Sequence, residues 1–367
     1  MKLLHVAECA GGVDRYLEML LPLLQDRFEQ VFVCSQNFDA NKYQRVAIRT
    51  HQLEMVQTFS PLRVVKEVNQ LRRIIMQEKP DVVYCHSSFA GALGRLACIG
   101  MGTKIVYNPH GWAFNMQGGS IFKRWLFLNI ERLLAKRTDK IVCISDAEYR
   151  SAIENCICDA EKLKIILNGI RIKDVEQAEP LNRSNIGFSE DEYVIGMIGR
   201  LMPQKAPDIF IKAGKLIKEI IPNAVFIIVG DGDETGWVMN YAKKNELKVY
   251  ITGWSDTPYS YLKIFDVAML LSRWEGFGLS IAEYMAARKN VIATRVDAIP
   301  TLIEDGVDGL LVDVDSPEDV RDKAIFLYRH PQEADDMKEK AYKKALRMFD
   351  IQRVGVQHIE LFDELAS

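Results

Sequence analysis

Short apolar segments alternate with longer helical stretches along the whole chain, and this rhythm constrains the fold more than any other feature. The segments are rich in Val and Ile and show no alternation of polar and apolar residues, which is typical of strands buried on both faces of a parallel sheet. The strands expected in the first half are Lys2–Ala7, Val31–Ser35, Asp81–His86, Lys104–Asn108, Lys140–Ser145 and Lys164–Leu167. Those expected in the second half are Tyr193–Gly199, Ala224–Val229, Val249–Thr252, Val267–Leu271, Val291–Thr294 and Gly309–Val312. Crossover helices are predicted between them, among them Pro61–Gln77, Ile121–Arg137, Asp208–Ile220 and Ser280–Arg288.

The rhythm lapses in a polar stretch between Ile170 and Asp191, which indicates a boundary between two domains. A length of 367 residues fits two domains of ordinary size. We therefore predict an α/β protein with two Rossmann-like domains that face each other across a cleft. The first domain is expected at 1–170, a linker at 171–190 and the second domain at 191–345, while a C-terminal helix at about 346–367 could pack back on the first domain.

Cysteine usage and the absence of long apolar runs indicate the compartment. The seven cysteines are scattered without a C-x-x-C pair, which favours free thiols in a reducing environment. Charged residues from Glu8 onward interrupt the apolar start too early for a signal peptide. No uncharged run approaches the roughly 18 residues that a spanning helix needs. We expect a cytoplasmic protein and no metal site.

Charge is divided unevenly along the chain. Residues 1–170 hold 22 Lys and Arg against 17 Asp and Glu, a net charge of +5, and the remainder carries −8. The stretch Ile121–Arg137 interleaves aromatic residues with five cations and one acid. Two interpretations stay open: a largely buried crossover helix with cations lying along its surface, or a basic edge that rests peripherally on the anionic inner face of the cell membrane. No nucleic-acid partner is expected.

The densest motif, Ser272–Ala286, follows a predicted buried strand directly. Glu275 lies in a turn flanked by glycines, and a helix is expected to begin near Gly278. Glycines allow a ligand to approach the backbone, and the free N–H groups of a helix N-terminus attract a diphosphate. Glu283 lies far enough along this helix to reach a group beside the phosphates, such as a ribose. The alternative, two solvated carboxylates, fits this context poorly.

Two cations, Arg200 and Lys205, follow the first strand after the linker. A departing nucleoside diphosphate develops negative charge that such cations can neutralise without a metal. Gly230 and Gly253 lie in turns that follow two further strands, where ligands bind in open α/β sheets, although turn geometry alone would also explain them.

The first half offers a weaker set of candidates. Gly11 and Gly12 follow the first strand in a loop that resembles a phosphate loop but lacks the G-x-G-x-x-G spacing, which disfavours a dinucleotide cofactor. His110 follows the strand Lys104–Asn108 beside a glycine and is expected to point into the cleft. A structural role and a functional role for this histidine are equally compatible with its position.

Taken in order, Arg200 with Lys205, Gly230-Asp231-Gly232, and Glu275 with Glu283 resemble the retaining GT-B glycosyltransferases of family four. The stretch Asn290–Asp313 fits the same pattern, so the resemblance covers nearly the whole chain. It implies a metal-independent hexosyltransferase without a cofactor, which transfers a sugar from a nucleotide-diphosphate donor, most simply a UDP-sugar. The segment around His110 resembles enzymes that extend lipid-linked or surface polysaccharides in bacteria, which implies a lipid-linked saccharide or glycan acceptor.

The resemblance also implies roles for individual residues. Glu275 would lie by the donor sugar and Glu283 would hold the ribose, Arg200 and Lys205 would hold the diphosphate, and His110 would touch the sugar. The catalytic set is thus Glu275, His110, Arg200 and Lys205. The residues expected at the nucleotide are Gly11, Gly12, Arg200, Lys205, Gly230, Gly253, Gly276, Phe277, Gly278, Leu279 and Glu283.

The chain departs from the family pattern at two places. Asp297–Thr301 stands where two glycines and a glutamate are frequent, and Ala206 replaces the common glycine after Lys205. These departures bear on the sugar rather than on the reaction class. Two other functions stay open: a nucleotide-sugar epimerase on the same architecture, for which no acid/base carboxylates can be identified, and a nucleotide-sugar-binding protein without turnover.

Overall fold

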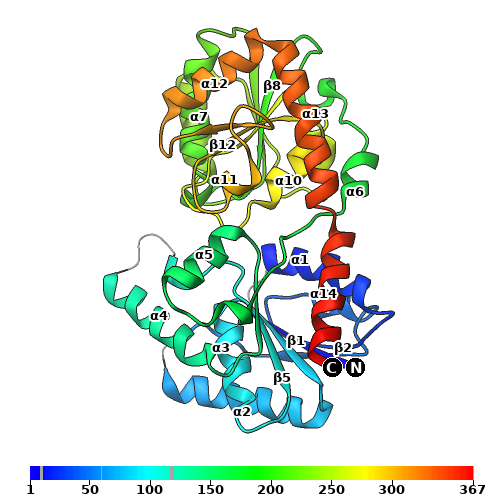
Figure 1. The fold of residues 1–367 in the computed structure, drawn as a ribbon. Coiled ribbons are helices and arrows are strands. Elements are labelled where there is room, and N and C mark those ends of the chain that lie inside the picture. Colours follow the sequence, from blue (N-terminus) through cyan, green and yellow to red (C-terminus); the bar gives the residue numbers. More distant parts are fainter. Residues whose placement is uncertain (9–10, 59, 116–119, 367) are drawn as a thin grey trace. The chain divides into compact units, whose positions relative to one another are not determined.

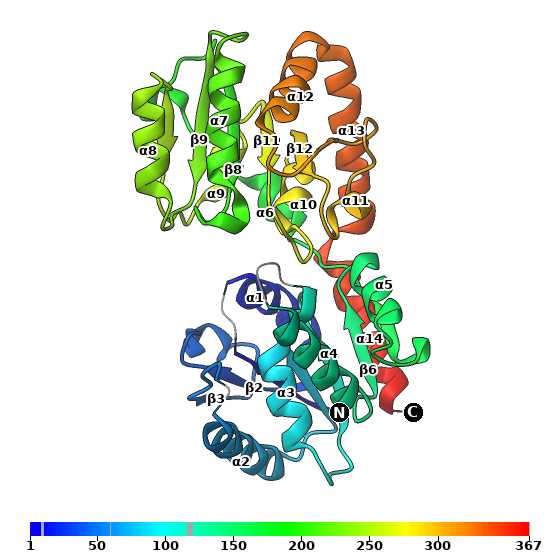
Figure 2. The ribbon, with the colours of Figure 1, turned by 90° about the vertical axis from the view of Figure 1, so that its left-hand side faces the viewer.

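The computed structural model describes residues 1–8, 11–58, 60–115 and 120–366, which form two compact units. The first unit comprises Met1–Gly169 together with Ile351–Ser367, and the second comprises Ile170–Asp350. Each unit is built on one parallel sheet with helices packed against it (Figure 1, Figure 2). The predicted α/β fold class with two parallel sheets is confirmed.

The first unit has a seven-stranded sheet in the order β3-β2-β1-β4-β5-β6-β7. Its strands are β1 (Lys2–Ala7), β2 (Glu29–Ser35), β3 (Arg49–Leu53), β4 (Val82–His86), β5 (Lys104–Asn108), β6 (Lys140–Cys143) and β7 (Leu163–Ile165). Its helices are α1 (Gly12–Leu24), α2 (Pro61–Glu78), α3 (Ser88–Ala97), α4 (Ile121–Ala135), α5 (Asp146–Glu154) and α14 (Ile351–Ala366).

Two apolar clusters cover the faces of this sheet. One gathers Leu3, Phe32 and Tyr84 with residues of α1 and α14, and the other gathers Leu4, Val33 and Val83 with residues of α2, α3 and α5. Helix α14, drawn in red, therefore lies among the blue and cyan elements of the first unit (Figure 1), although it is the last segment of the chain.

The second unit has a six-stranded sheet in the order β10-β9-β8-β11-β12-β13. Its strands are β8 (Tyr193–Ile198), β9 (Ala224–Val229), β10 (Val249–Ile251), β11 (Val267–Leu270), β12 (Asn290–Thr294) and β13 (Leu310–Val312). Its helices are α6 (Ile172–Gln177), α7 (Pro207–Lys218), α8 (Thr235–Lys244), α9 (Pro258–Leu262), α10 (Leu279–Ala286), α11 (Ile299–Leu302), α12 (Pro317–Arg329) and α13 (Pro331–Met348). Residues of α7, α8, α12 and α13 form one apolar core with the strands.

Two details of the organisation differ from the sequence-based expectation. Strand β3 was not predicted, because its sequence Arg-Thr-His-Gln-Leu is polar, as suits a partly exposed strand at the edge of a sheet. The segment 171–190 is not a free linker: it carries α6, belongs to the second unit, and its Leu181 N–H donates to the Ser260 carbonyl. The chain returns to the first unit between Asp350 and Ile351.

Helix α4 is attached to the first unit mainly through its second half. Glu131, Leu134 and Ala135 are its buried residues. Glu131 forms a buried ion pair with Arg95 of α3 at 2.8 Å and also accepts a hydrogen bond from Tyr107. By contrast, the first five residues of α4, from Ile121 to Trp125, are all exposed. The interpretation of α4 as a largely buried crossover helix is therefore wrong for its first half.

Candidate active site

The strand order of the second unit reverses between β8 and β11, and the predicted cations and glutamate follow these two strands. At such a reversal, the connections after neighbouring strands leave to opposite sides and open a crevice at the carboxyl edge of the sheet. Arg200 follows the end of β8, Lys205 ends the short 3-10 helix Pro203–Lys205, and Glu275 lies between β11 and α10. The structure thus places all three at the ligand-binding edge of the sheet.

Lys205 and Glu275 are in direct contact. The Lys205 Nζ lies 2.5 Å from Glu275 Oε2, and the Ser272 hydroxyl donates to the same oxygen at 3.1 Å. Both charged side chains are mostly shielded from solvent, with 16% and 12% of their surfaces exposed. The sequence assigned the two residues to different parts of a ligand, whereas the structure joins them in one ion pair. Arg200, in contrast, is exposed.

Arg273 holds this pair in place and was not identified from the sequence. Its guanidinium donates to both carboxylate oxygens of Asp208 at 2.9 and 3.0 Å, to Asp315 at 2.7 Å and to the Pro203 carbonyl at 2.7 Å. Its backbone N–H donates to the Gln204 carbonyl. Arg273 therefore ties the segment that carries Lys205 to the segment that carries Glu275.

The two departures from the family pattern have structural consequences at the same place. Ala206 has φ 50 and ψ 51, a left-handed conformation that costs a residue with a Cβ about 1–2 kcal/mol and explains why glycine suits this position. Asp297 also has a positive φ, and its carboxylate accepts the backbone N–H of Glu275 at 2.8 Å. Burial raises the pKa of Asp297, as does the neighbouring charge of Glu275. Asp297 is a second residue at this site that sequence reasoning missed.

The glycine-rich turn leads into α10 as predicted, and its residues differ in how far they are exposed to a ligand. Gly278 precedes the helix with φ 92, and Leu279, the first helical residue, is partly exposed. The Phe277 side chain is buried and packs edge-on against Phe349, so a ligand would meet only its backbone, and Gly276 is half-buried in the turn.

Glu283 lies in the middle of α10 and is 1% exposed, with its Oε1 accepting a hydrogen bond from Tyr259 at 3.2 Å. Glu275 is also mostly shielded. Neither glutamate is a solvated surface carboxylate.

Gly230 has a packing role that the sequence left open. A Cβ at Gly230 would lie 2.1 Å from the Gly199 carbonyl, and one at Gly232 would lie 2.3 Å from that of Leu201. The loop after β9 therefore packs against the loop that carries Arg200 and supports it through a hydrogen bond from Leu201 to Asp231. Gly253 has no such packing role, because a Cβ there would meet no atom of the described residues within 4 Å, although its φ of +69 favours glycine.

In the first unit the strand order reverses between β1 and β4, and His110 lies two residues beyond β5. Its ring is half-buried, packs against the ring of Tyr16 at 4.9 Å and lies 3.2 Å from the ring of His86 between Nε2 and Nδ1. Gly11 precedes α1 with φ 86, and among the described residues no atom lies within 4 Å of a Cβ built at Gly11 or Gly12. The preceding residues of the expected phosphate loop, 9 and 10, lie outside the described part of the chain.

Glu148 positions the loop that carries His110 and was also missed. This buried carboxylate at the start of α5 accepts the backbone N–H of Gly111 at 2.5 Å and that of Ile144 at 2.8 Å. Its backbone carbonyl accepts the indole N–H of Trp112. Burial raises the pKa of Glu148 to about 8 against the effect of the two backbone donors. A capping-box signature, Ser145 followed three residues later by Glu148, was the signal available in the sequence.

Four of the six histidines form one cluster within the first unit: His5, His86, His110 and His358. Burial lowers the pKa of His5 and His110 to about 3, that of His358 to about 4, and that of His86 well below its ordinary value. His358, on α14, lies 3.1 Å from the Tyr16 hydroxyl and 3.0 Å from that of Tyr84. These rings are neutral at pH 7, and His358 ties α14 to α1 and β4.

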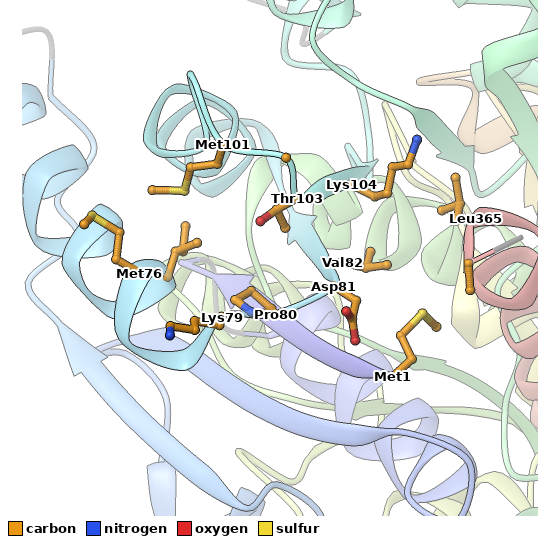
Figure 3. Close-up of a pocket in the computed structure, with 13 residues that line it drawn as sticks. Met1, Met76, Lys79, Pro80, Asp81, Val82, Met101, Thr103, Lys104 and Leu365 are labelled. Atoms are coloured by element: carbon orange, nitrogen blue, oxygen red, sulfur yellow. The ribbon is translucent and has the colours of Figure 1, made fainter.

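A pocket of about 640 Å³ lies elsewhere in the first unit. It is lined by residues at the amino ends of β4 and β5, including Asp81, Val82 and Lys104, together with Met1 and Leu365 (Figure 3). Ligands in parallel α/β sheets bind at the opposite, carboxyl edge, where His110 lies. This pocket is therefore not the candidate active site. Within the described ranges, no His, Cys, Asp and Glu side chains form a group of three or more that could hold a metal.

Two parallel sheets, with a shielded ion pair at the strand reversal of the second, define a two-domain α/β protein of the Rossmann-like class. Residues 10–174 match the family described as Glycosyltransferase Family 4, and residues 179–344 match Glycosyl transferases group 1. An Escherichia coli protein named UDP-Gal:alpha-D-GlcNAc-diphosphoundecaprenol alpha-1,3-galactosyltransferase is 30% identical over 342 residues, which cover 86% of each chain.

Solved structures share the fold over the whole chain. Anabaena HepE in complex with UDP superposes with a TM-score of 0.81 at 21% identity and covers 99% of this chain and 100% of its own. A glycosyltransferase from Rickettsia africae gives a TM-score of 0.85 at 19% identity, with 100% and 98% coverage. The chain belongs to the GT-B glycosyltransferases of family four, which confirms the predicted family.

The neutral histidines make the first unit sensitive to acid. Their pKa values are lower in the folded protein than in the unfolded chain, so below about pH 6.5 the unfolded chain binds protons that the folded protein does not. Their contribution is complete above pH 6.5 and is lost as the pH falls, at up to about 1.4 kcal/mol per pH unit for each group. Glu148 acts in the opposite sense, because its raised pKa favours the folded protein as the pH falls.

We expect the net free energy of unfolding, measured by urea titration, to decrease as the pH is lowered from 7.5 to 5. The variant His358→Gln is expected to show a shallower dependence than the wild type, whatever its stability at pH 7.5. A wild-type stability that does not change across this range would contradict the neutral, buried state of the four rings.

Proposed function

We propose that the protein is a retaining glycosyltransferase that moves a hexose from a UDP-sugar to a lipid-linked or polysaccharide acceptor in bacterial cell-surface glycan synthesis. The observation that carries this proposal is the shielded Lys205–Glu275 pair, held by Arg273 at the strand reversal directly before the N-terminus of α10. This arrangement combines a cation, a carboxylate and free backbone N–H groups, which suit a sugar diphosphate.

The identity of donor and acceptor is supported by the relatives. HepE is described in complexes with UDP and with UDP-glucose, and the name of the E. coli relative gives a UDP-sugar donor and a lipid-diphosphate acceptor. A putative glycosyltransferase of Bacillus subtilis, EpsD, is 26% identical over 295 residues, covering 78% of this chain and 77% of its own. The donor class and the acceptor class are therefore proposed from similarity to these relatives.

The proposed reaction needs charge stabilisation at the leaving group. The bond between the anomeric carbon and the diphosphate oxygen breaks, and its electron pair stays on the departing UDP. The acceptor hydroxyl forms the new bond on the same face of the sugar, and its proton passes to the diphosphate oxygen, so the configuration is retained. Arg200, Lys205 and the N-terminus of α10 stabilise the departing charge, and no metal or other cofactor is required.

The experiment that tests this function incubates the purified protein with labelled UDP-sugars and GDP-sugars and a membrane lipid extract. Label transferred from a UDP-sugar to lipid or glycan, with an α-linkage retained from the donor, is the expected result. Isomerised free donor would indicate the epimerase instead, and binding without turnover would indicate a non-catalytic protein; either outcome would overturn the proposal.

The two cations after β8 give the first prediction for this reaction. We expect Arg200→Ala and Lys205→Ala each to lower kcat/KM by the equivalent of about 2–4 kcal/mol, as for other preorganised groups that stabilise developing charge. Steady-state kinetics with the donor identified above measures the effect. Lys215→Ala removes an exposed cation from the last turn of α7 and serves as the control, with unchanged kinetics expected. Near-normal turnover in both folded variants would remove the cations from the mechanism.

The two glutamates should separate binding from turnover. Glu283→Ala is expected mainly to weaken UDP binding, measured by calorimetry, because a ribose contact exists in the ground state and the transition state alike. Glu275→Ala is expected mainly to lower kcat, because this carboxylate would lie by the sugar in the proposed reaction and is paired with Lys205. The reverse pattern, with UDP affinity lost only in Glu275→Ala, would exchange the two assignments.

We further propose that the protein is cytoplasmic and associates peripherally with the inner face of the cell membrane through α4. None of the described helices has the length and apolar character needed to cross a bilayer. However, Ile121, Phe122 and Trp125 are 89%, 69% and 58% exposed, and the exposed cations Lys123 and Arg124 lie between them. An exposed helix end with apolar and cationic side chains suits the interface of an anionic bilayer, where each cation contributes about 1 kcal/mol.

Sedimentation with liposomes tests this association. We expect pelleting with anionic but not neutral vesicles, and less pelleting at high salt. Replacing Lys123, Arg124, Lys136 and Arg137 by Gln should abolish it. A control variant replaces four exposed lysines of the second unit by Gln, namely Lys215, Lys243, Lys244 and Lys343, and should pellet like the wild type. Equal pelleting of both variants, or pelleting independent of anionic lipid, would favour an acceptor that is not bound at the membrane.

A further inference from the structure

A row of three histidine rings leads from the centre of the sheet of the first unit to His110. His5 lies on β1, His86 ends β4, and both are fully buried. The His5 Nδ1 lies 3.4 Å from His86 Nε2, and the His86 Nδ1 lies 3.2 Å from His110 Nε2. His86, in the middle of the row, thus uses Nε2 toward His5 and Nδ1 toward His110, while His5 and His110 each use one nitrogen within the row.

Only two proton arrangements satisfy such a row. Because burial lowers the pKa of all three histidines, each ring is neutral and carries one N–H group and one acceptor nitrogen. Either every proton is on Nε2, and the N–H groups point inward from His110 to His5, or every proton is on Nδ1, and they point outward. A mixed arrangement would place two N–H groups or two lone pairs against each other.

The inner end of the row decides between these arrangements. Gln30, on β2, is 1% exposed, and its amide nitrogen donates to the carbonyls of Leu21 at 3.0 Å and Val46 at 3.2 Å. These two bonds orient the amide and leave its Oε1 as an acceptor. Within the described part of the chain, neither this oxygen nor His5 Nε2 has a partner at hydrogen-bond distance, and both are buried. The two side chains lie on the same face of the sheet, because the neighbouring strands β1 and β2 pair with Leu3 opposite Gln30 and His5 opposite Phe32. Gln30 also raises the pKa of His5, against the larger effect of burial.

An N–H on His5 Nε2 would supply the donor that the buried Gln30 Oε1 lacks. In the outward arrangement, His5 Nε2 and Gln30 Oε1 would both remain buried acceptors without a donor, which is unfavourable. The inward arrangement is therefore the more stable one. We propose that Gln30, through His5 and His86, fixes His110 as the tautomer that carries its proton on Nε2 and presents Nδ1 as a hydrogen-bond acceptor.

Gln30, His5 and His86 are in this sense positioning residues for His110. Among the described residues, none lies within hydrogen-bond distance of the His110 Nδ1, and the ring is partly exposed. The consequence for catalysis rests on the function proposed above: a hydroxyl of the donor sugar would donate to Nδ1, whereas a group that can only accept would be rejected at this position.

His358 provides an internal reference for the test. Its Nδ1 lies 2.8 Å from the Val354 carbonyl, which can only accept, so this nitrogen carries the proton. Its Nε2 then accepts from a tyrosine hydroxyl. One histidine of the same cluster thus has the opposite tautomer to the one proposed for the row, and both must appear in a single spectrum.

Nitrogen-15 NMR of the full-length protein with labelled histidines, without substrate, reads the tautomers directly. In the wild type, His5, His86 and His110 should show protons on Nε2, and His358 should show its proton on Nδ1. In Gln30→Met, the acceptor is lost at similar volume, and His110 should change partly or wholly to the Nδ1 tautomer. Gln52→Met removes a glutamine on β3 that also donates to a backbone carbonyl, and should leave the tautomers unchanged.

A wild-type His110 with its proton on Nδ1 would overturn the proposal, as would Gln30→Met with wild-type tautomers. If Gln30→Met does not fold, the wild-type spectrum alone decides. Because the spectra need no substrate, failure of the glycosyltransferase assay would leave this result unaffected, so the two proposals fail separately.

Discussion

Parallel strand pairing is the constraint on which both candidate sites depend. It brings the carboxyl ends of all strands in a unit to one edge, and the reversal of strand order opens that edge between β8 and β11 and between β1 and β4. Polar side chains that are distant in sequence meet at this edge because their strands are neighbours, whatever the length or sequence of the connecting helices. Lys205 and Glu275, 70 residues apart, form their ion pair because their strands are neighbours in the sheet.

Shielding from solvent determines how the charges at this edge are held. A charged group that is removed from water must be paired or hydrogen-bonded. Lys205 and Glu275 pair with each other. Arg273 pairs with Asp208 and Asp315, and these ion pairs fix the segments that carry Lys205 and Glu275. The site is thus supported by a second layer of ion pairs, and a ligand would enter a charge arrangement that is already organised.

Much of the fold could be predicted from the sequence, because buried parallel strands have a distinct composition. Strand β3 was not predicted, because this edge strand has a polar composition. The residues at the ends of strands, such as Arg200, Glu275 and His110, could be named from position. Arg273, Asp297 and Glu148 could not, because their importance lies in backbone groups that they hold: the Pro203 carbonyl and the N–H groups of Glu275 and Gly111. Contacts of Arg273 and Asp297 with backbone groups leave no spacing in the sequence, and the capping box of Ser145 and Glu148 indicates the start of a helix rather than a site.

The two candidate sites differ in electrostatic character, and this difference fits a division of tasks in the proposed reaction. The second unit carries cations, which can stabilise a diphosphate that gains charge as the bond breaks. In the first unit, burial removes the charge from His5, His86 and His110, so the row cannot contribute a cation. A neutral ring of fixed tautomer instead offers a directional hydrogen bond, which discriminates among hydroxyl positions of a sugar. Residues 1–170 are basic overall, but the histidine row within them is neutral, so the excess cations remain available for an anionic surface such as the one proposed for α4.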